Sequence, residues 1–263
     1  MPGSTKAMHP SGKLEITFTE EDHVYMDGNA ITYTSATTLV KSAFPPFDAA
    51  AAAAAKEAKT GRPAAEWIAE WNEIGRKASD DGTRCHENCE RQILGQYDRM
   101  NKPRDDAERK RFRIAWHEVE KIKAARFLKL EPEKLVFSPR FMVAGSIDLL
   151  GQKEGPDDFA IIDWKYIREL KRESFGGRTG NHLATAALPD CNFWHYALQL
   201  NIYEQILRIE GYIPPTARVT KMLNVYDDAA DGFDHVILPD LGREAVLLLA
   251  WNVTSDNLEP CPF

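Results

Sequence analysis

Long apolar runs and any sign of a secretory leader are missing from this sequence of 263 residues. No stretch approaches the roughly 18 consecutive apolar residues of a membrane-spanning helix, which excludes an integral membrane protein. The segment before Leu14 lacks both the apolar core of a signal peptide and the Arg-rich pattern of a transit peptide, although Pro2-Gly3-Ser4 leaves a trimmed targeting segment open. We therefore expect an intracellular protein, without distinguishing cytoplasm, nucleus and organelle.

Cysteine is scarce, with four in the chain, and these do not make a disulfide framework. Reduced thiols are the expectation for such a chain. Cys85, His86 and Cys89 raise the alternative of a zinc or iron–sulfur site. Structural metal sites usually draw on paired cysteines, however, and no second C-x-x-C or H-x-x-x-H is present. The pattern therefore favours a chain without such a site.

Acidic side chains outnumber basic ones by 40 to 33, which gives a formal net charge of −7. The charge is unevenly spread, because residues 99–134 carry twelve Lys or Arg against seven Asp or Glu, and residues 224–263 carry one against eight. A basic segment on an acidic protein can bind a polyanion. It can also be a solvated helix with ion pairs between residues four apart, and charge alone favours this second interpretation.

Apolar periodicity predicts helices in the first half of the chain and mainly strands in the second. The predicted helices cover about 36–43, 48–60, 63–79, 84–97, 104–128, 193–210 and 240–253, with a turn at 80–83. The predicted strands form a meander within 14–40 and then cover 135–141, 143–150, 159–166, 217–226 and 233–238, with a loop at 167–192. This order predicts an α/β domain with a helical N-terminal elaboration.

Charged side chains interrupt two neighbouring predicted strands. Because side chains alternate along a strand, Asp163 and Lys165 project to one side, with Ile162 and Trp164 on the other. A hairpin brings Asp148 alongside, and two carboxylates beside an ammonium suit Mg²⁺ or Mn²⁺. The ammonium would orient or help deprotonate a water while the metal neutralises phosphoryl charge. The alternative is that both acids flank turns and Lys165 pairs with one of them, and spacing alone does not decide.

Two predicted helices carry further polar side chains. His86 lies one turn into a helix that opens with Gly82-Thr83, from which its imidazole could reach the same pocket. Gln199 and Tyr203 are four apart, so they share a helix face. Taken singly, the histidine is more often an ordinary surface or core residue, and the second pair an accident of amphipathicity.

Taken together, these residues resemble the PD-(D/E)xK nuclease superfamily in its RecB-like branch. The motifs follow one another in the expected order, as Gly82-Thr83-x-x-His86, Gly145-x-Ile147-Asp148, Ile162-Asp163-Trp164-Lys165 and Gln199-x-x-x-Tyr203. Similarity to the mitochondrial genome maintenance exonucleases and their viral and phage relatives extends to His23-x-Tyr25 before Asp27-Gly28, to Ser35-x-Thr37 and to Glu133. The resemblance spans about residues 20–250. Each motif is weak alone, and their order makes the signal specific.

The resemblance implies a restriction-endonuclease-like core, in which helices flank a mixed central sheet. It divides the chain into a flexible N-terminus at 1–13, a β-meander and helical region at 14–134, and the nuclease core at 135–263. The region 14–134 would contribute His86 and DNA-binding surface. The last two parts would form one integrated domain.

The resemblance also assigns roles to residues. Asp148 and Asp163 would bind the metal with His86 and the main-chain carbonyl of Trp164, and Lys165 would be the catalytic lysine. The implied cofactor is Mg²⁺, for which Mn²⁺ would substitute. The second acid is an aspartate where the family more often has glutamate, and this branch accepts both.

Further roles concern the DNA strand and the cysteines. Gln199 and Tyr203 would support the lysine and contact DNA. A backbone phosphate would lie at a helix N-terminus, against Ser35, Thr37 and Thr38. No iron–sulfur cluster is expected, because the branch members that carry one have three clustered late cysteines, and here only Cys191 and Cys261 come late.

The resemblance favours DNA as the partner of the basic segment 99–134, where aromatic rings interleave with cations as single-stranded DNA binding requires. Those rings are Phe112, Trp116 and Phe127, and further cations in the loop are Lys171, Arg172 and Arg178. The helical region 45–80 could form an arch or lid that a free strand threads. For its Trp67 and Trp71, packing against the nuclease sheet is the favoured alternative to base stacking.

We expect a monomeric, Mg²⁺-dependent DNA exonuclease that acts on single-stranded or flap ends in replication, repair or recombination, without a membrane partner. Two alternatives stay open. One is a structure-specific endonuclease of the same fold. The other is a catalytically silent DNA-binding module, against which the presence of Asp148, Asp163 and Lys165 argues.

Overall fold

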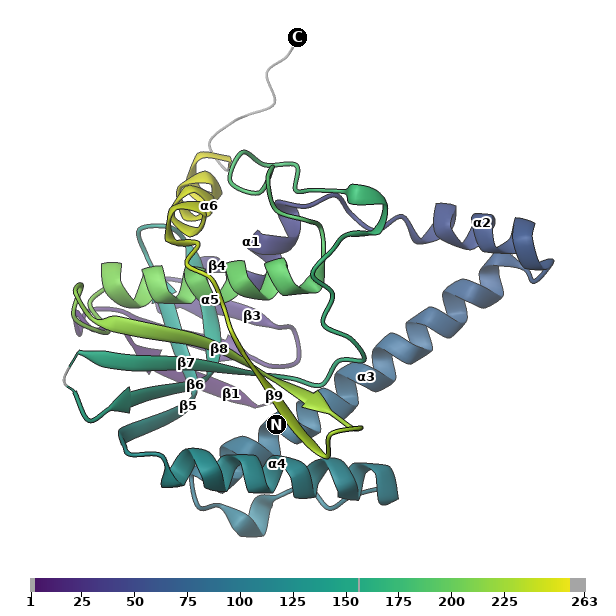
Figure 1. Cartoon of the computed structure of the whole chain (residues 1–263). Helices are drawn as coiled ribbons and strands as arrows, with labels where there is room; N and C mark the ends of the chain where they lie inside the picture. Colours follow the sequence, from purple (N-terminus) through teal and green to yellow (C-terminus); the bar gives the residue numbers. More distant parts are fainter. Residues whose placement is uncertain (1–2, 156, 256–263) are drawn as a thin grey trace.

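Nine strands form one mixed sheet in the computed structural model, which describes residues 3–155 and 157–255 (Figure 1). The strands are β1 (Ser4–Met8), β2 (Glu15–Thr19), β3 (Val24–Asp27), β4 (Thr32–Ser35), β5 (Phe127–Ser138), β6 (Val143–Lys153), β7 (Asp158–Lys165), β8 (Arg218–Asp227) and β9 (Gly232–Ile237). The α-helices are α1 (Ala36–Ser42), α2 (Ala49–Thr60), α3 (Ala64–Ile93), α4 (Asp106–Ala124), α5 (Asn192–Ile209) and α6 (Gly242–Ser255). Two short 3₁₀ turns are η1 (Tyr97–Arg99) and η2 (Phe175–Gly177).

The strand order is β1-β2-β3-β4-β6-β7-β8-β9, with β5 paired to β6 outside this path. Neighbours are antiparallel except in the pairs β4–β6 and β7–β8. Parallel neighbours need a crossover connection, and α5 supplies it between β7 and β8. The strands β5, β6 and β7 follow one another as an antiparallel meander (the central meander), in which β6 pairs with both of its neighbours in sequence and, among the described strands, β5 pairs with β6 alone.

Helices cover both faces of this sheet. On one face, α1, α5 and α6 pack over the largest apolar cluster, and α4 with the C-terminal half of α3 covers a second cluster on the other face (Figure 1). The predicted α/β class, a mixed central sheet flanked by helices with a helical N-terminal elaboration, is confirmed. Among residues 3–155 and 157–255, no helix is both long and apolar enough to cross a membrane.

Strand β7 shows the predicted alternation of faces. Ile161 belongs to the cluster under α5, whereas Ile162 and Trp164 belong to the cluster under α3 and α4. Both faces are therefore buried, as expected for a central strand with a near-continuous apolar run. Asp163 and Lys165 alternate with these apolar residues, so their charged groups are carried into the interior of the fold.

The helix α3 corrects one prediction, because it runs unbroken through the turn expected at 80–83. Asp80 and Asp81 form ion pairs with Arg104, and Asp81 also pairs with Arg111 at 3.1 Å. These partners lie on or just before α4, so tertiary contacts hold the turn-forming sequence in a helix. Gly82 inside the helix costs only about 1 kcal/mol relative to alanine, which such contacts offset.

The tryptophans of the predicted arch do not pack against the sheet, which corrects the favoured interpretation. Helix α2 and the N-terminal half of α3 project from the body as an arm (Figure 1). Trp67 and Trp71 contact each other there, with ring centroids 6.3 Å apart. Lys56 and Arg62 each lie 4.4 Å from the Trp67 ring. The Trp67 ring therefore has cations against it and joins the two helices of the arm.

Two boundaries also differ from the prediction. Ser4–Met8 lies in the segment expected to be flexible, yet it pairs with β2 as an edge strand. Strand β5 begins at Phe127, where a helix was predicted, and it continues through Pro132. It pairs with β6 along almost its whole length, and this long-range pairing outweighs the local helical pattern.

A buried ion pair fixes α5 to the sheet. Lys221 on β8 and Glu204 on α5 form an ion pair in which both side chains are less than a tenth exposed, and Glu204 also accepts hydrogen bonds from Arg208. Breaking such a pair leaves an uncompensated buried charge, which typically costs about 3–5 kcal/mol. The pair therefore holds the helix that carries Gln199 and Tyr203.

We predict that Lys221→Met lowers the free energy of unfolding by about 3 kcal/mol, as measured by urea denaturation. The matched control is Arg218→Met on the same strand, which removes an exposed pair with Asp158 and should cost less than about 1 kcal/mol. Equal losses in the two variants would contradict this role of the buried pair.

Candidate metal centre

Three carboxylates line up across the central meander. The β5–β6 pairs Pro132–Leu149 and Lys134–Ile147 flank Glu133 and Asp148, which places these two acids opposite each other. The β6–β7 ladder ends at the pair Leu149–Ile162, and Asp148 and Asp163 are the next residues of the two strands. Residues directly opposite one another share a face of the sheet with closely spaced Cβ atoms. Strand pairing therefore brings together acids that lie up to thirty residues apart in the sequence.

Glu133 interrupts the regular geometry of β5. Its φ is +46°, a left-handed conformation that is uncommon for a glutamate and is often found at functional sites. Its carboxylate accepts a hydrogen bond from the Ser146 hydroxyl at 2.8 Å. The strained backbone and this hydrogen bond aim the side chain at Asp148.

His86 reaches the same point from α3. Its Nδ1 lies 3.3 Å from Asp148 Oδ2, and the ring also forms a hydrogen bond with the Trp164 backbone. The Trp164 N–H in turn donates to Asp148 Oδ2 at 2.9 Å. Burial, and then the nearby Lys165 ammonium, lower the pKa of His86 to about 4. The imidazole is therefore neutral near pH 7, as a metal ligand must be.

His86, Glu133 and Asp148 each offer one ligand atom, and these atoms all lie within 4.8 Å of one another. Burial, and then repulsion by Asp148, raise the pKa of Glu133 to about 8, and burial raises the pKa of Asp148 as well. Two half-buried carboxylates without a cation of their own are costly, and a divalent cation would compensate them. Oxygen ligands with one imidazole suit Mg²⁺ or Mn²⁺, so the residues fit a metal.

Asp163 engages the lysine. Its Oδ2 lies 2.6 Å from Lys165 Nζ in an ion pair, and burial raises the pKa of Asp163 to about 6 in spite of that ammonium. Burial opposes the charge on Lys165, but Asp163 and Asp148 outweigh it and raise the lysine pKa. The Nζ also lies 4.8 Å from the Tyr196 ring centroid. Lys165 is therefore a fixed cation beside the metal centre.

Helix α5 contributes the predicted polar pair. Gln199 Nε2 donates to the Tyr203 hydroxyl at 3.1 Å, and both residues line the cleft of the candidate site. A Cβ atom at Gly145 would lie 2.5 Å from the Tyr203 ring, so only glycine admits the tyrosine there. The Gly145 of the motif is thus explained by the close approach of Tyr203 to β6. Burial raises the pKa of Tyr203, which keeps the hydroxyl protonated.

A cleft of about 650 Å³ contains this arrangement. Its walls come from the β2–β3 hairpin, α3, the central meander and α5, and His86, Glu133, Asp148, Lys165 and Tyr203 all line it.

The structure separates the predicted phosphate-binding residues. Ser35 and Thr37 line the cleft. However, the Ser35 hydroxyl caps α1 by accepting from the Thr38 N–H at 3.0 Å, and it donates to the Thr38 hydroxyl at 2.8 Å. Helix α1 has seven residues, and the N–H of its third residue is thereby engaged. Thr37 is left as the hydroxyl that faces the cleft.

The predicted DNA-binding cations lie outside the cleft lining. Arg172 packs 4.2 Å from the Phe193 ring, and Lys171 approaches Glu169 at 3.9 Å. Within the basic segment 99–134, ten of the twelve cations form ion pairs with carboxylates. This pattern favours the solvated, ion-paired helix over a free polyanion-binding strip.

The sequence did not identify Glu133 as a candidate metal ligand, nor Tyr196 as a side chain that contacts Lys165. Glu133 carried a signal only through its resemblance to related exonucleases, because the register that sets it opposite Asp148 is not visible in a single sequence. Tyr196 stands three residues before Gln199, which places it on a neighbouring part of the same helix surface.

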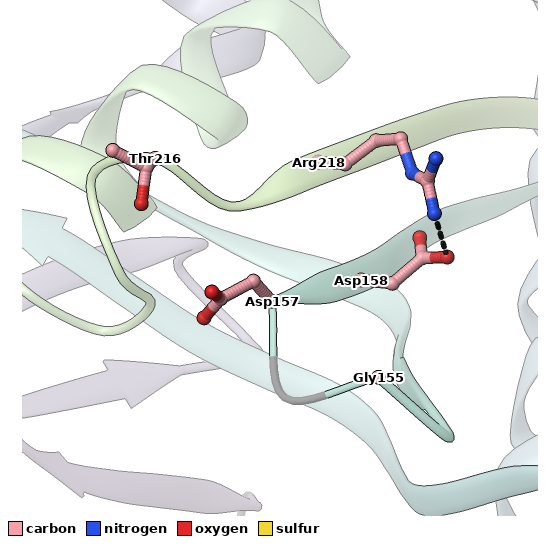
Figure 2. Close-up of a pocket in the computed structure, with 5 residues that line it drawn as sticks. All are labelled: Gly155, Asp157, Asp158, Thr216 and Arg218. Carbon is pink, nitrogen blue, oxygen red and sulfur yellow. Dashed lines mark hydrogen bonds and ion pairs between the residues drawn. The ribbon is translucent and has the colours of Figure 1, made fainter.

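A second, smaller hollow of about 290 Å³ lies at the other end of β7 (Figure 2). It is lined by Gly155, Asp157, Asp158, Thr216 and Arg218, and Arg218 donates to Asp158 at 2.9 Å. The Asp158 carboxylate is thus already balanced by a guanidinium. Asp158 offers a matched control for the acids of the centre, because it starts the same strand that Lys165 ends.

We predict that Glu133→Gln stabilises the metal-free protein at alkaline pH. A raised pKa means that the folded state binds the Glu133 proton more tightly than the unfolded state does. The stability that this proton gives the folded wild type is therefore fully present below about pH 4.5 and is lost as the pH rises towards 8. Removing the charge should raise the free energy of unfolding in EDTA at pH 9 by at least about 1 kcal/mol. The same variant should lose most of the stabilisation that Mn²⁺ gives the wild type.

The control is Glu131→Gln on the same strand. Burial opposes its ionisation, but Lys134 and Lys129 lower the pKa of Glu131. Its replacement should therefore be neutral or cost up to about 1 kcal/mol. A Glu133→Gln protein no more stable than the wild type at pH 9 would show that Glu133 bears no electrostatic strain.

Comparison with known proteins does not assign a function to this chain. The chain matches no model of a known protein family and no curated protein. Among solved structures, it is similar to a "Putative exonuclease" from Eubacterium rectale, with 14% sequence identity, 69% of this chain and 72% of that chain covered, and a TM-score of 0.42. The function is therefore inferred from the residues of the cleft.

Proposed function

We propose that the protein is a metal-dependent deoxyribonuclease of the exonuclease type, which hydrolyses phosphodiester bonds at single-stranded or flap ends. The observation that carries this proposal is the convergence of His86, Glu133 and Asp148 beside Lys165 in one open cleft. A neutral imidazole, two strained carboxylates and a fixed ammonium together suit the binding of a cation and of a phosphoryl group.

Mg²⁺ is the proposed cofactor, and Mn²⁺ would substitute for it. His86, Glu133 and Asp148 would hold the ion, and Asp163 and the Trp164 carbonyl are the further ligands that the sequence motifs suggest. When bound, the ion would supply positive charge to stabilise the phosphoryl oxygens as the bond breaks.

Lys165 would act as a cation. Its raised pKa keeps it protonated at neutral pH, so it would orient the attacking water and stabilise negative charge instead of removing a proton. The water oxygen would bond to phosphorus while the bond to the 3′ oxygen breaks, leaving a 5′-phosphate and a 3′-hydroxyl. Asp163 and Tyr196 would hold the ammonium in place.

The charged side chains that line the cleft favour single-stranded DNA over duplex DNA as the substrate. The cleft lining includes the five carboxylates of Glu20, Glu87, Glu90, Glu133 and Asp148. Within the part of the chain that the structure describes, Lys165 is the one lysine or arginine that lines it. Duplex DNA carries one charge per roughly 1.7 Å and is usually bound through several cations. A single strand can instead present one phosphate to the centre and turn its bases to the walls.

We predict that Asp148→Asn lowers Mg²⁺-dependent digestion of end-labelled single-stranded DNA by at least about 100-fold, because it removes a metal carboxylate. Asp158→Asn at the distal hollow should digest at the wild-type rate. Comparable rates for wild type and Asp148→Asn would show that the site is wrongly assigned. Blocking one terminus or the other in the same gel would give the polarity of digestion.

Closed circular single strands distinguish the exonuclease from an endonuclease of the same fold. An enzyme that needs an end should leave the circle intact while it degrades the same strand after linearisation. Cutting of the circle would favour the endonuclease. Binding of DNA without turnover in Mg²⁺ and Mn²⁺ would instead favour a catalytically silent DNA-binding module.

A further inference from the structure

Three aromatic rings of the β2–β3 hairpin, those of Phe18, His23 and Tyr25, form a cluster on one wall of the cleft. The Phe18 and Tyr25 rings are stacked, with centroids 4.5 Å apart, and the His23 ring stands edge-on to Phe18 at 5.1 Å. All three residues line the cleft that contains the metal centre. Tyr25 is buried, Phe18 is half-buried and His23 is exposed. The ring surface open to a ligand therefore belongs to Phe18 and His23.

The cluster adjoins the candidate metal centre through Tyr25. The Tyr25 hydroxyl forms a hydrogen bond with the Ser146 backbone. Burial raises the pKa of Tyr25 most, and the neighbouring Glu133 and Asp148 carboxylates raise it further. Phe18 stacks on Tyr25, and the His23 ring stands edge-on to both of them, 5.1 Å from Phe18 and 5.9 Å from Tyr25. In a DNA strand bound at the metal centre, the group next to the bound phosphate would thus contact Phe18 and His23.

The backbone presents the His23 ring in a strained conformation. Its φ is +51°, in the left-handed region, and its N–H donates to the Glu20 carbonyl at 3.3 Å to close the turn. Left-handed backbone at a non-glycine residue costs of order 1 kcal/mol or more and persists where the surroundings impose it. The turn therefore holds an exposed imidazole in place against Phe18.

The charged side chains next to this aromatic cluster determine which kinds of ligand can bind to it. Glu20 lies in the same turn and close to Glu90 on α3. Burial raises the pKa of Glu90, Arg91 lowers it, and the nearby Glu20 carboxylate raises it further. Glu20 and Glu90 both line the cleft, and among residues 3–155 and 157–255 no lysine or arginine lines this wall. A phosphate would be repelled here. A planar ring that stacks on Phe18 and His23 and offers N–H groups to the carboxylates would be accepted.

We infer that Phe18 and His23 form a nucleobase-binding subsite, and that Glu20 and Glu90 favour bases with an exocyclic amino group. Stacking on aromatic side chains accepts any base. Carboxylates accept hydrogen bonds from the amino groups of cytosine and adenine, whereas thymine offers carbonyl oxygens in the corresponding position. This inference rests on the proposed function, because it supplies the base contact next to the phosphodiester under attack.

The test is the binding of 5′-fluorescein-labelled (dC)₈, (dA)₈ and (dT)₈ to the full chain in Ca²⁺ at fixed ionic strength, followed by fluorescence anisotropy. The wild type should bind (dC)₈ and (dA)₈ several-fold more tightly than (dT)₈. His23→Asn, whose side chain tolerates the left-handed backbone, and Phe18→Leu should each weaken binding about tenfold or more. His23→Tyr should restore it, because it restores a ring.

The matched control is Asp22→Asn, in the same turn but outside the cleft lining, which should bind as the wild type does. Glu20→Gln and Glu90→Gln should reduce the preference for (dC)₈ over (dT)₈ without weakening (dT)₈. Equal binding of all three oligonucleotides by the wild type, or unchanged binding by both ring variants, would overturn the subsite.

Digestion assays separate this outcome from failure of the proposed function. Metal-dependent digestion that is the same in the wild type, His23→Asn and Phe18→Leu, together with unchanged binding, would overturn the subsite and leave the nuclease standing. Base-selective binding that depends on the rings, without digestion in Mg²⁺ or Mn²⁺, would support the subsite and overturn the nuclease. Absence of oligonucleotide binding by the wild type would overturn both.

Discussion

Repulsion among carboxylates that strand pairing forces together is the constraint on which the rest of the structure depends. Glu133, Asp148 and Asp163 lie at neighbouring positions along three successively paired strands, and one ammonium, that of Lys165, is ion-paired with Asp163. The other two acids face a neutral His86 imidazole. Their charge must be balanced by bound protons or by a cation, so the arrangement is more stable with a metal than without one.

The scaffold keeps these groups in place through interactions that are themselves well satisfied. Trp164 is buried under α3 and α4 and fixes the strand between Asp163 and Lys165. The Glu204–Lys221 pair fixes α5, which in turn lays Tyr203 against β6. Electrostatic strain is thus concentrated at the cleft, whereas apolar packing and compensated ion pairs hold its walls. This distribution is typical of a preorganised site.

Short-range patterns predicted much of the site because they depend on local geometry. Side-chain alternation along β7 places Asp163 and Lys165 on one side, and the hairpin places Asp148 alongside. Long-range contacts could not be predicted in the same way. Helix α3 continues through residues 80–83 because Arg104 and Arg111 neutralise its aspartates, and the cations of the basic segment are engaged by acids of other elements as well as their own.

The sequence by itself determined the α/β class, most elements of the sheet and its helices, and the candidate acids and lysine, because hydrophobic periodicity and motif spacing are properties of neighbouring residues. Only the tertiary structure decided that Glu133 lies beside His86 and Asp148, that Asp163 forms an ion pair with Lys165, and that an aromatic cluster and several carboxylates line the same cleft. These outcomes depend on strand register and on which charges meet in space, and neither is set by any single stretch of the chain.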